Sequence, residues 1–188
     1  CKWLFEVGAA ADITKANNDG FTPMFAACFN GHLLVCKWLY KVGAGKDITK
    51  AVNDGSTHMF IACQNGHLSV CKWLFEVGAA ADITKANNNG ATPMYIACQE
   101  GHLSVCKWLF EVGAAADITK ANNDGFTPMF AACFNGHLLV CKWLYKVGAG
   151  KDITKAVNDG STHMFIACQN GHLSVCKWLF EVGAAADI

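Results

Sequence analysis

The chain has 188 residues, of which 53% are hydrophobic, and its 15 basic residues balance its 15 acidic residues. All the basic residues are lysines and they are spread along the chain, so no basic stripe is available for phosphates and we expect no nucleic-acid partner. No run approaches the roughly 20 apolar residues of a membrane-spanning helix, and we expect no membrane association.

The chain repeats itself every 35 residues. The segment GHLLVCKWLYKVG begins at Gly31, and related segments begin at Gly66, Gly101, Gly136 and Gly171. An internal period of this length is typical of a solenoid, in which each repeat buries its apolar side against its neighbours. We therefore predict a single array over residues 1–188, divided into a partial repeat at 1–19, complete repeats at 20–54, 55–89, 90–124 and 125–159, and a truncated repeat at 160–188.

A longer period of 105 residues, or three repeats, lies over the first. Residues 1–83 and 106–188 are identical, although the folding of a solenoid does not require such identity. Cys1 begins inside a helix pattern, Ile188 ends inside a connection, and the terminal repeats carry the same apolar residues as the internal ones. We therefore expect the segment to continue into a longer array, with assembly into a fibre as a further expectation.

Turn and capping residues place two helices in each repeat, as residues 20–54 illustrate. The Thr-Pro pair at 22–23 predicts a helix start, because Thr is a good N-cap and Pro fits the first helical position. That short helix is expected over 23–29, because Gly31 enters the left-handed conformation without steric cost. A second helix is predicted from about 32 to 42.

The second helix of the repeat is amphipathic. Its apolar residues recur at i, i+3 and i+4, while Lys37 and Lys41 fall on the opposite face. Residues 43–55 hold no helical period, and from Asp47 to Gly55 we expect an extended finger closed by an Asp-Gly turn.

This order of turn, short helix, tight turn, longer helix and finger resembles the ankyrin repeat. The residues that carry the resemblance are Asp19-Gly20, Thr22-Pro23-Met24, Ala27-Cys28, Gly31-His32, Val35-Cys36, Leu39-Tyr40 and Gly43-Ala44. The resemblance implies an all-α, right-handed solenoid of helix–turn–helix units with a finger in each repeat. The repeat is two residues longer than the family's usual 33, and His58 and His163 replace the helix-starting proline, so those helices are expected to start less rigidly.

Cysteine and histidine together spell C-x3-H-x3-C in each repeat, beginning with Cys28, His32 and Cys36. The spacing is similar to that of a metal-ligand set, but zinc needs a fourth ligand and supporting hydrogen bonds. The resemblance instead implies that the cysteines fill small core sites and that the histidine binds backbone between repeats. We predict reduced structural thiols with no metal and no cofactor, which favours the cytoplasm; disulfides in an oxidising compartment are the other alternative.

One tryptophan recurs on the second helix of every repeat, between the apolar stripe and the lysines. Indoles at such an edge fit into grooves between adjacent repeats. The alternative is an exposed apolar stripe along the outer face, which marks a surface for another chain. The ladder consists of Trp3, Trp38, Trp73, Trp108, Trp143 and Trp178.

Positions that differ between repeats gather around the first helix. The resemblance implies that this face and the finger tips line a concave groove where partner proteins bind. The alternative is drift at solvated positions, where substitutions have little effect on stability. The partner-binding candidates are Phe21, Ala26, Phe29, Asn30, Ser56, Ile61, Gln64, Asn65, Ala91, Ile96, Gln99, Glu100, Phe126 and Phe134.

Catalysis has little support, because no nucleophile, base and orienting acid form a unique set. A feature present in every repeat belongs to the scaffold. The sequence predicts a non-enzymatic scaffold that binds a protein partner, with other copies of the chain among the partners considered. The alternative is a regulatory or targeting arm of a larger protein whose activity lies outside this segment.

Overall fold

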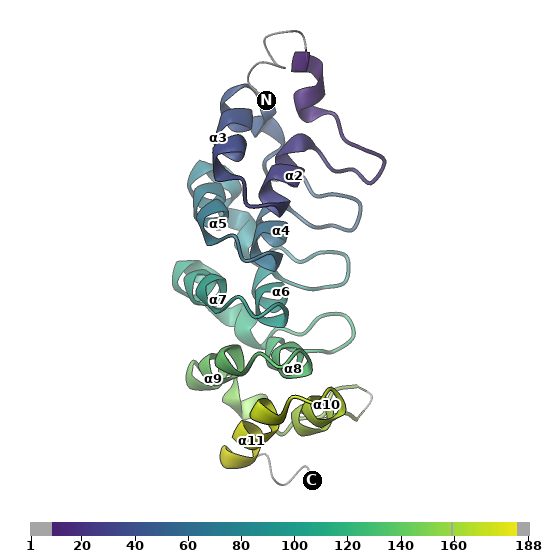
Figure 1. The fold of residues 1–188 in the computed structure, drawn as a ribbon, viewed down its shortest axis with the longest axis vertical. Helices are drawn as coiled ribbons and strands as arrows, with labels where there is room; N and C mark the ends of the chain where they lie inside the picture. Colours follow the sequence, from purple (N-terminus) through teal and green to yellow (C-terminus); the bar gives the residue numbers. More distant parts are fainter. Residues whose placement is uncertain (1–8, 159, 184–188) are drawn as a thin grey trace.

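A computed structural model describes residues 9–158 and 160–183. Pairs of short helices stack along one axis, from the N-terminal repeats at one end to α11 at the other (Figure 1). The only regular elements in the described residues are helices, which confirms the all-α solenoid predicted from the sequence.

Two columns of helices run the length of the stack. The inner column lies beside the projecting loops in Figure 1 and contains α2 (Pro23–Phe29), α4 (His58–Gln64), α6 (Pro93–Gln99), α8 (Pro128–Phe134) and α10 (His163–Gln169). The outer column contains α3 (Leu33–Lys41), α5 (Leu68–Leu74), α7 (Leu103–Leu109), α9 (Leu138–Lys146) and α11 (Leu173–Glu181).

Short 3₁₀ and π turns precede each projecting loop. They are η1 (Ala9–Thr14), η2 (Ala44–Asp47), η3 (Phe75–Ala79), η4 (Ala80–Thr84), η5 (Phe110–Ala114), η6 (Ala115–Thr119) and η7 (Ala149–Asp152). The predicted start of the finger at Asp47 is wrong, because η2 ends at that residue and Lys50 N still donates to Asp47 O at 2.9 Å. The extended finger begins at about residue 50.

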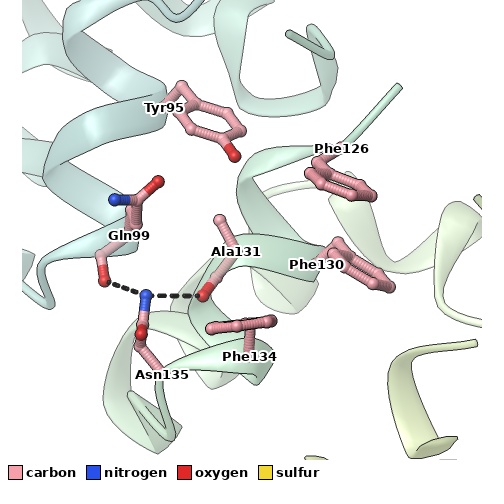
Figure 2. Close-up of a pocket in the computed structure, with 7 residues that line it drawn as sticks. All are labelled: Tyr95, Gln99, Phe126, Phe130, Ala131, Phe134 and Asn135. Atoms are coloured by element: carbon pink, nitrogen blue, oxygen red, sulfur yellow. Dashed lines mark hydrogen bonds between the residues drawn. The ribbon is translucent and has the colours of Figure 1, made fainter. Parts of the chain in front are cut away.

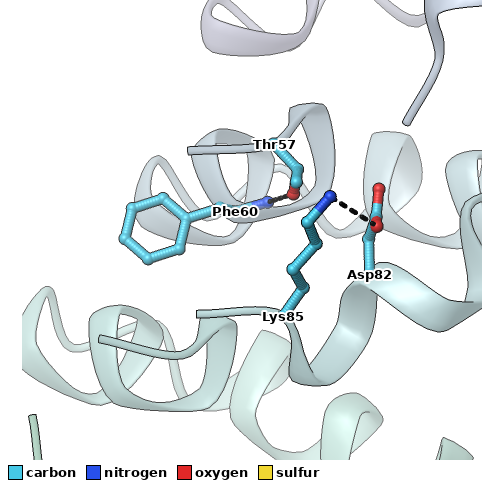
Figure 3. A network of polar contacts seen from close by, with 4 residues as sticks. All are labelled: Thr57, Phe60, Asp82 and Lys85. Atoms are coloured by element: carbon cyan, nitrogen blue, oxygen red, sulfur yellow. Dashed lines mark hydrogen bonds and ion pairs between the residues drawn. The ribbon is translucent and has the colours of Figure 1, made fainter. Parts of the chain in front are cut away.

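Each inner helix starts at a threonine N-cap. In α4 the Thr57 Oγ1 accepts a hydrogen bond from Phe60 N at 3.1 Å (Figure 3). This cap forms although His58 replaces the proline found at the start of α2, and both helices have seven residues. The capping position predicted from the Thr-Pro pair is therefore confirmed, and it is the same with or without proline.

The core is one continuous column that recurs from repeat to repeat. In the repeat of α4 and α5, Met59, Cys63, Cys71 and Leu74 are fully buried, and the outward lysines stay exposed, as Lys72 illustrates. Burial of this kind against both neighbours stabilises a solenoid repeat. No helix in residues 9–158 and 160–183 is both long and apolar enough to cross a membrane.

Candidate functional site

Side-chain hydrogen bonds fix successive repeats against one another. His67 Nε2 donates to Phe29 O of the preceding repeat at 2.9 Å, which confirms the backbone contact implied for the Gly-His histidine. At the finger tips, Asn88 Nδ2 donates to Asn53 O at 3.1 Å, and Asn123 Nδ2 donates to the Asn88 O at 3.0 Å. The fingers therefore stand in register as a wall beside the inner helices (Figure 1).

The fold brings the two cysteines of a repeat together but not the histidine between them. The two Sγ atoms lie 3.5–3.8 Å apart in the five described pairs, whereas a disulfide bond is roughly 2.05 Å long. Burial and the neighbouring thiol raise the pKa of Cys63 well above its usual range, which disfavours the thiolate that a metal requires. Within the described ranges, no three potential ligands cluster as a metal site.

The tryptophans pack between repeats. Tyr40 lies edge-on to Trp73 with ring centroids 5.8 Å apart, and Phe75 lies in the same way against Trp108 at 5.9 Å. Edge-to-face pairs of this kind add to the stability gained from burial. Trp3 lies outside the described residues. Among the others, Trp73, Trp108 and Trp178 are 6–8% exposed. Trp38 and Trp143 are half-buried.

The inner helices and the fingers enclose a surface with two neighbouring hollows. We call this surface the groove and define it as the exposed parts of α4, α6 and α8 together with finger residues 54, 87–91 and 122–126. The two hollows have volumes of about 230 Å³ each. They are smaller than the roughly 300–1,000 Å³ of most small-molecule pockets.

The first hollow is apolar and lies between α6 and α8 (Figure 2). The rings of Phe126 and Phe130 stack with their centroids 5.0 Å apart, and Phe134 is 43% exposed. Asn135 Nδ2 donates to Gln99 O at 3.0 Å and so joins the two helices at one edge of the hollow. We call this the apolar hollow; its lining residues are Tyr95, Gln99, Phe126, Phe130, Ala131, Phe134 and Asn135.

The second hollow is polar and lies between α4, α6 and the fingers. Its carboxylates belong to Asp54 and Asp124, and none of the described residues that line it is Lys, Arg or His. It shares Tyr95 and Gln99 with the apolar hollow, so the two are adjacent. We call it the polar hollow; its lining residues are Asp54, Phe60, Gln64, Asn87, Asn89, Ala91, Tyr95, Ile96, Gln99, Asn122 and Asp124.

Tyr95 forms the boundary between the two hollows. Its hydroxyl accepts a hydrogen bond from Asn122 Nδ2 at 3.5 Å. Burial, and to a lesser degree Asp124, raises the pKa of Tyr95 to about 12. The hydroxyl is therefore neutral at physiological pH and is able both to donate and to accept hydrogen bonds.

Finger lysines pair with aspartates at the base of the fingers. Lys50 Nζ lies 2.8 Å from Asp47 Oδ1, and Lys85 Nζ lies 3.9 Å from Asp82 Oδ1 (Figure 3). Burial raises the pKa of Asp82. None of these four residues lines either hollow, and Lys120 of the next finger lies near Asp117 and also lines neither.

Several residues named from the sequence meet in the two hollows. Phe126 and Phe134 line the apolar hollow, and Gln99 lines both. The polar hollow is lined by Gln64, which is half-buried, and by Ala91 and Ile96, which are buried.

The remaining named residues lie elsewhere or are covered. Ser56 and Ile61 are buried. Asn30 and Asn65 direct their side-chain amides to carbonyls of their own helices, and Glu100 is exposed and accepts a hydrogen bond from Gln99. Phe21, Ala26 and Phe29 are exposed on α2 and its preceding loop and line neither hollow.

Sequence reasoning missed Tyr95, Phe130, Asp54 and Asp124. Tyr95 carried a signal, because the other complete repeats have Phe at that position. The finger of the same repeat also carried a signal, because its tip residue is Asn89 where the other fingers have Asp. Phe130 gave no signal because it looks like a core residue in every repeat.

Comparison with known families agrees with the geometry. Sequence models described as "Ankyrin repeats (3 copies)" match residues 44–120, 79–156 and 113–188, and one described as "Ankyrin repeats (many copies)" matches residues 1–40. A search among curated proteins found no match. The family matches cover nearly all of the sequence and coincide with the helix pairs and fingers described above. The chain therefore belongs to the ankyrin repeat family.

Proposed function

We propose that this chain is a non-enzymatic scaffold that binds a protein partner through the groove. Ankyrin repeats mediate protein–protein interaction. The observation that carries the proposal is that the repeats share their core but differ where the hollows lie. Position 96 is Ile in α6 and the equivalent position 131 is Ala in α8, and Gln99 of α6 corresponds to Phe134 of α8.

The size and shape of the hollows favour a protein partner over a small molecule. Each hollow holds about 230 Å³, which suits one or two side chains, and the two lie side by side on an open face. Protein interfaces derive most of their binding energy from a few side chains seated in such hollows. A folded or extended protein segment therefore fits the groove better than an enclosed ligand does.

Affinity purification with matched variants tests this proposal. We would compare the proteins captured by the wild-type chain, by the double variant Ala131→Ile with Phe134→Gln, and by Leu139→Ser. Each substitution introduces the residue that another repeat carries at that position. Leu139 is 69% exposed on the outer helix α9, so it serves as the control.

The expected result is a set of proteins retained by wild type and Leu139→Ser and lost from the groove variant. If the groove variant captures the same proteins as the wild type, the groove is not the binding surface. If Leu139→Ser alone loses them, the outer helices bind the partner.

Self-assembly is the second candidate function, favoured by the identity of residues 1–83 and 106–188, which offers the same surface twice. It requires an apolar surface outside the stack. The tryptophans expected to supply that surface pack between repeats, and three of them are buried. Sedimentation of the chain over a wide concentration range decides the matter: growth in mass supports assembly, and a constant mass of 20.2 kDa contradicts it.

A further inference from the structure

The apolar hollow is created by a small residue at one helical position. Ile61, Ile96 and Ile166 occupy that position in α4, α6 and α10, and each is 7% exposed. Ala131 occupies it in α8, and its methyl group leaves a space beside the rings of Phe126 and Phe134 (Figure 2). The chain therefore has an apolar space next to α8 at a position where three other repeats carry the larger isoleucine.

The exposed aromatic surface of this hollow favours an apolar occupant. Phe134 is 43% exposed and Phe126 is half-buried, so water is displaced from both rings when an apolar side chain enters. The backbone groups at the rim are already paired, because Asn135 Nδ2 donates to both Gln99 O and Ala131 O. An aromatic or long aliphatic side chain fits this space.

The polar hollow favours a cation. Asp54 and Asp124 are both exposed carboxylates on finger tips. Lys50 and Lys85 pair with aspartates at the base of their fingers. A Lys or Arg side chain can donate to the carboxylates and to the amide oxygens around them, and an acidic side chain would be repelled there.

The distance between the two hollows sets the spacing, along the partner, of the apolar side chain and the basic side chain. Adjacent hollows lie about one helix–helix distance apart, roughly 8–10 Å, and an extended chain advances about 3.3 Å per residue. We propose that the groove binds an extended protein segment with one aromatic or long aliphatic residue and one Lys or Arg about three positions away. This inference rests on the proposed function and adds the chemistry of the partner.

A peptide library provides the test. Random peptides long enough to span both hollows would be displayed on phage and selected against the 188-residue chain. The expected binders carry the apolar and basic pair at the stated spacing. Affinities of individual synthetic peptides would then be measured by fluorescence polarisation against the wild-type chain and its variants.

Groove variants separate the two contacts. Ala131→Ile and, independently, Phe134→Gln are each expected to weaken binding by about tenfold or more, the loss typical of removing an interface anchor. Asp54→Asn combined with Asp124→Asn is expected to weaken binding at low salt and to remove its salt dependence. Leu139→Ser is the control and should bind as wild type does.

The outcomes distinguish an error in the partner's chemistry from an error in the binding surface. Binders that are lost from the groove variants but lack the pair, or carry acidic residues instead, overturn this inference and leave the groove as the binding surface. Binders that ignore every groove variant, or a library that yields no binder, overturn the proposed function as well. Circular dichroism confirms that each variant is folded, as expected from the residues that neighbouring repeats carry at these positions.

Discussion

The repeats that contain α6 and α8 have the same core and different faces. Met94 and Met129 are equivalent and equally buried, and both helices start at a threonine cap and have seven residues. At the groove, however, Ile96 of α6 corresponds to Ala131 of α8. The comparison teaches that a solenoid separates the residues that hold the stack together from those that shape its surface, so one face can change without altering the neighbouring repeat.

The largest effect should come from breaking what the repeats share. Trp108→Ala removes a buried indole that packs edge-on against Phe75 of the preceding repeat. We expect a loss of about 3–5 kcal/mol in the free energy of unfolding, measured by urea denaturation. Trp108→Phe keeps an aromatic ring and should lose less. A Trp108→Ala variant as stable as wild type would mean that the ladder does not hold the repeats together.

Leu74→Ala removes a fully buried side chain of α5 that recurs in every repeat. Its expected cost is about 2–5 kcal/mol, from lost burial and the cavity left behind. Leu139→Ala is the matched control, because Leu139 is exposed and its loss should change stability by less than about 0.5 kcal/mol. Equal effects in the two variants would show that the core face has been assigned wrongly.

His58 makes the stability of the α4 repeat depend on pH. Burial lowers the pKa of His58 to about 4, although the Ile48 backbone and Asp47 act in the opposite direction. The unfolded value is about 6.5, so protonation favours the unfolded chain. The stability is complete above about pH 6.5 and falls as the pH is lowered to about 4, by about 3 kcal/mol in all.

His58→Pro isolates this dependence, since proline occupies the equivalent position in α2, α6 and α8. His163 and all carboxylates are unchanged in the variant, so the difference between the two pH profiles belongs to His58. Unfolding would be followed by urea denaturation at several pH values. Parallel profiles for wild type and variant would contradict the prediction.

The smallest effect should come from exchanging what the repeats do not share. Ala131→Ile is expected to change the free energy of unfolding by less than about 1 kcal/mol, because it fills an open hollow with a residue that other repeats carry there. Ala132→Ile is the contrasting variant, because Ala132 is fully buried and overpacking should cost about 1–3 kcal/mol. Similar losses for both variants, measured by urea denaturation, would mean that the hollow beside position 131 does not accommodate a larger side chain.

Most of the fold could be predicted because its signals are local. Thr22 caps the first helix, and Gly31 has the left-handed φ of 71° that its place after the helix requires. The start of the finger could not be predicted, because the segment Gly45-Lys46 has no strong preference that distinguishes a 3₁₀ turn from an extended strand. Local signals therefore fix helix ends better than they fix loops.

The groove could be predicted only in part, because a hollow depends on two repeats at once. Ala26 and Ala131 are identical in sequence context, yet Ala26 is exposed and Ala131 is buried. The difference arises because α6 packs beside α8 on the N-terminal side, whereas only η1 among the described residues precedes α2. A periodic sequence reveals which positions vary but not which neighbour covers them.

The side-chain hydrogen bonds between finger tips affect how the stack responds to force. Asn88 reaches back to residue 53, Asn123 to residue 88 and Asn158 to residue 124, so successive fingers from residue 53 to residue 158 are joined by the same kind of link. Because these links follow one another along the stack, a bend or pull on the array is distributed among them and is not concentrated at one hinge. If the proposed groove binds an extended segment, tension would open or close the groove gradually and the affinity for that segment would vary with the load on the array.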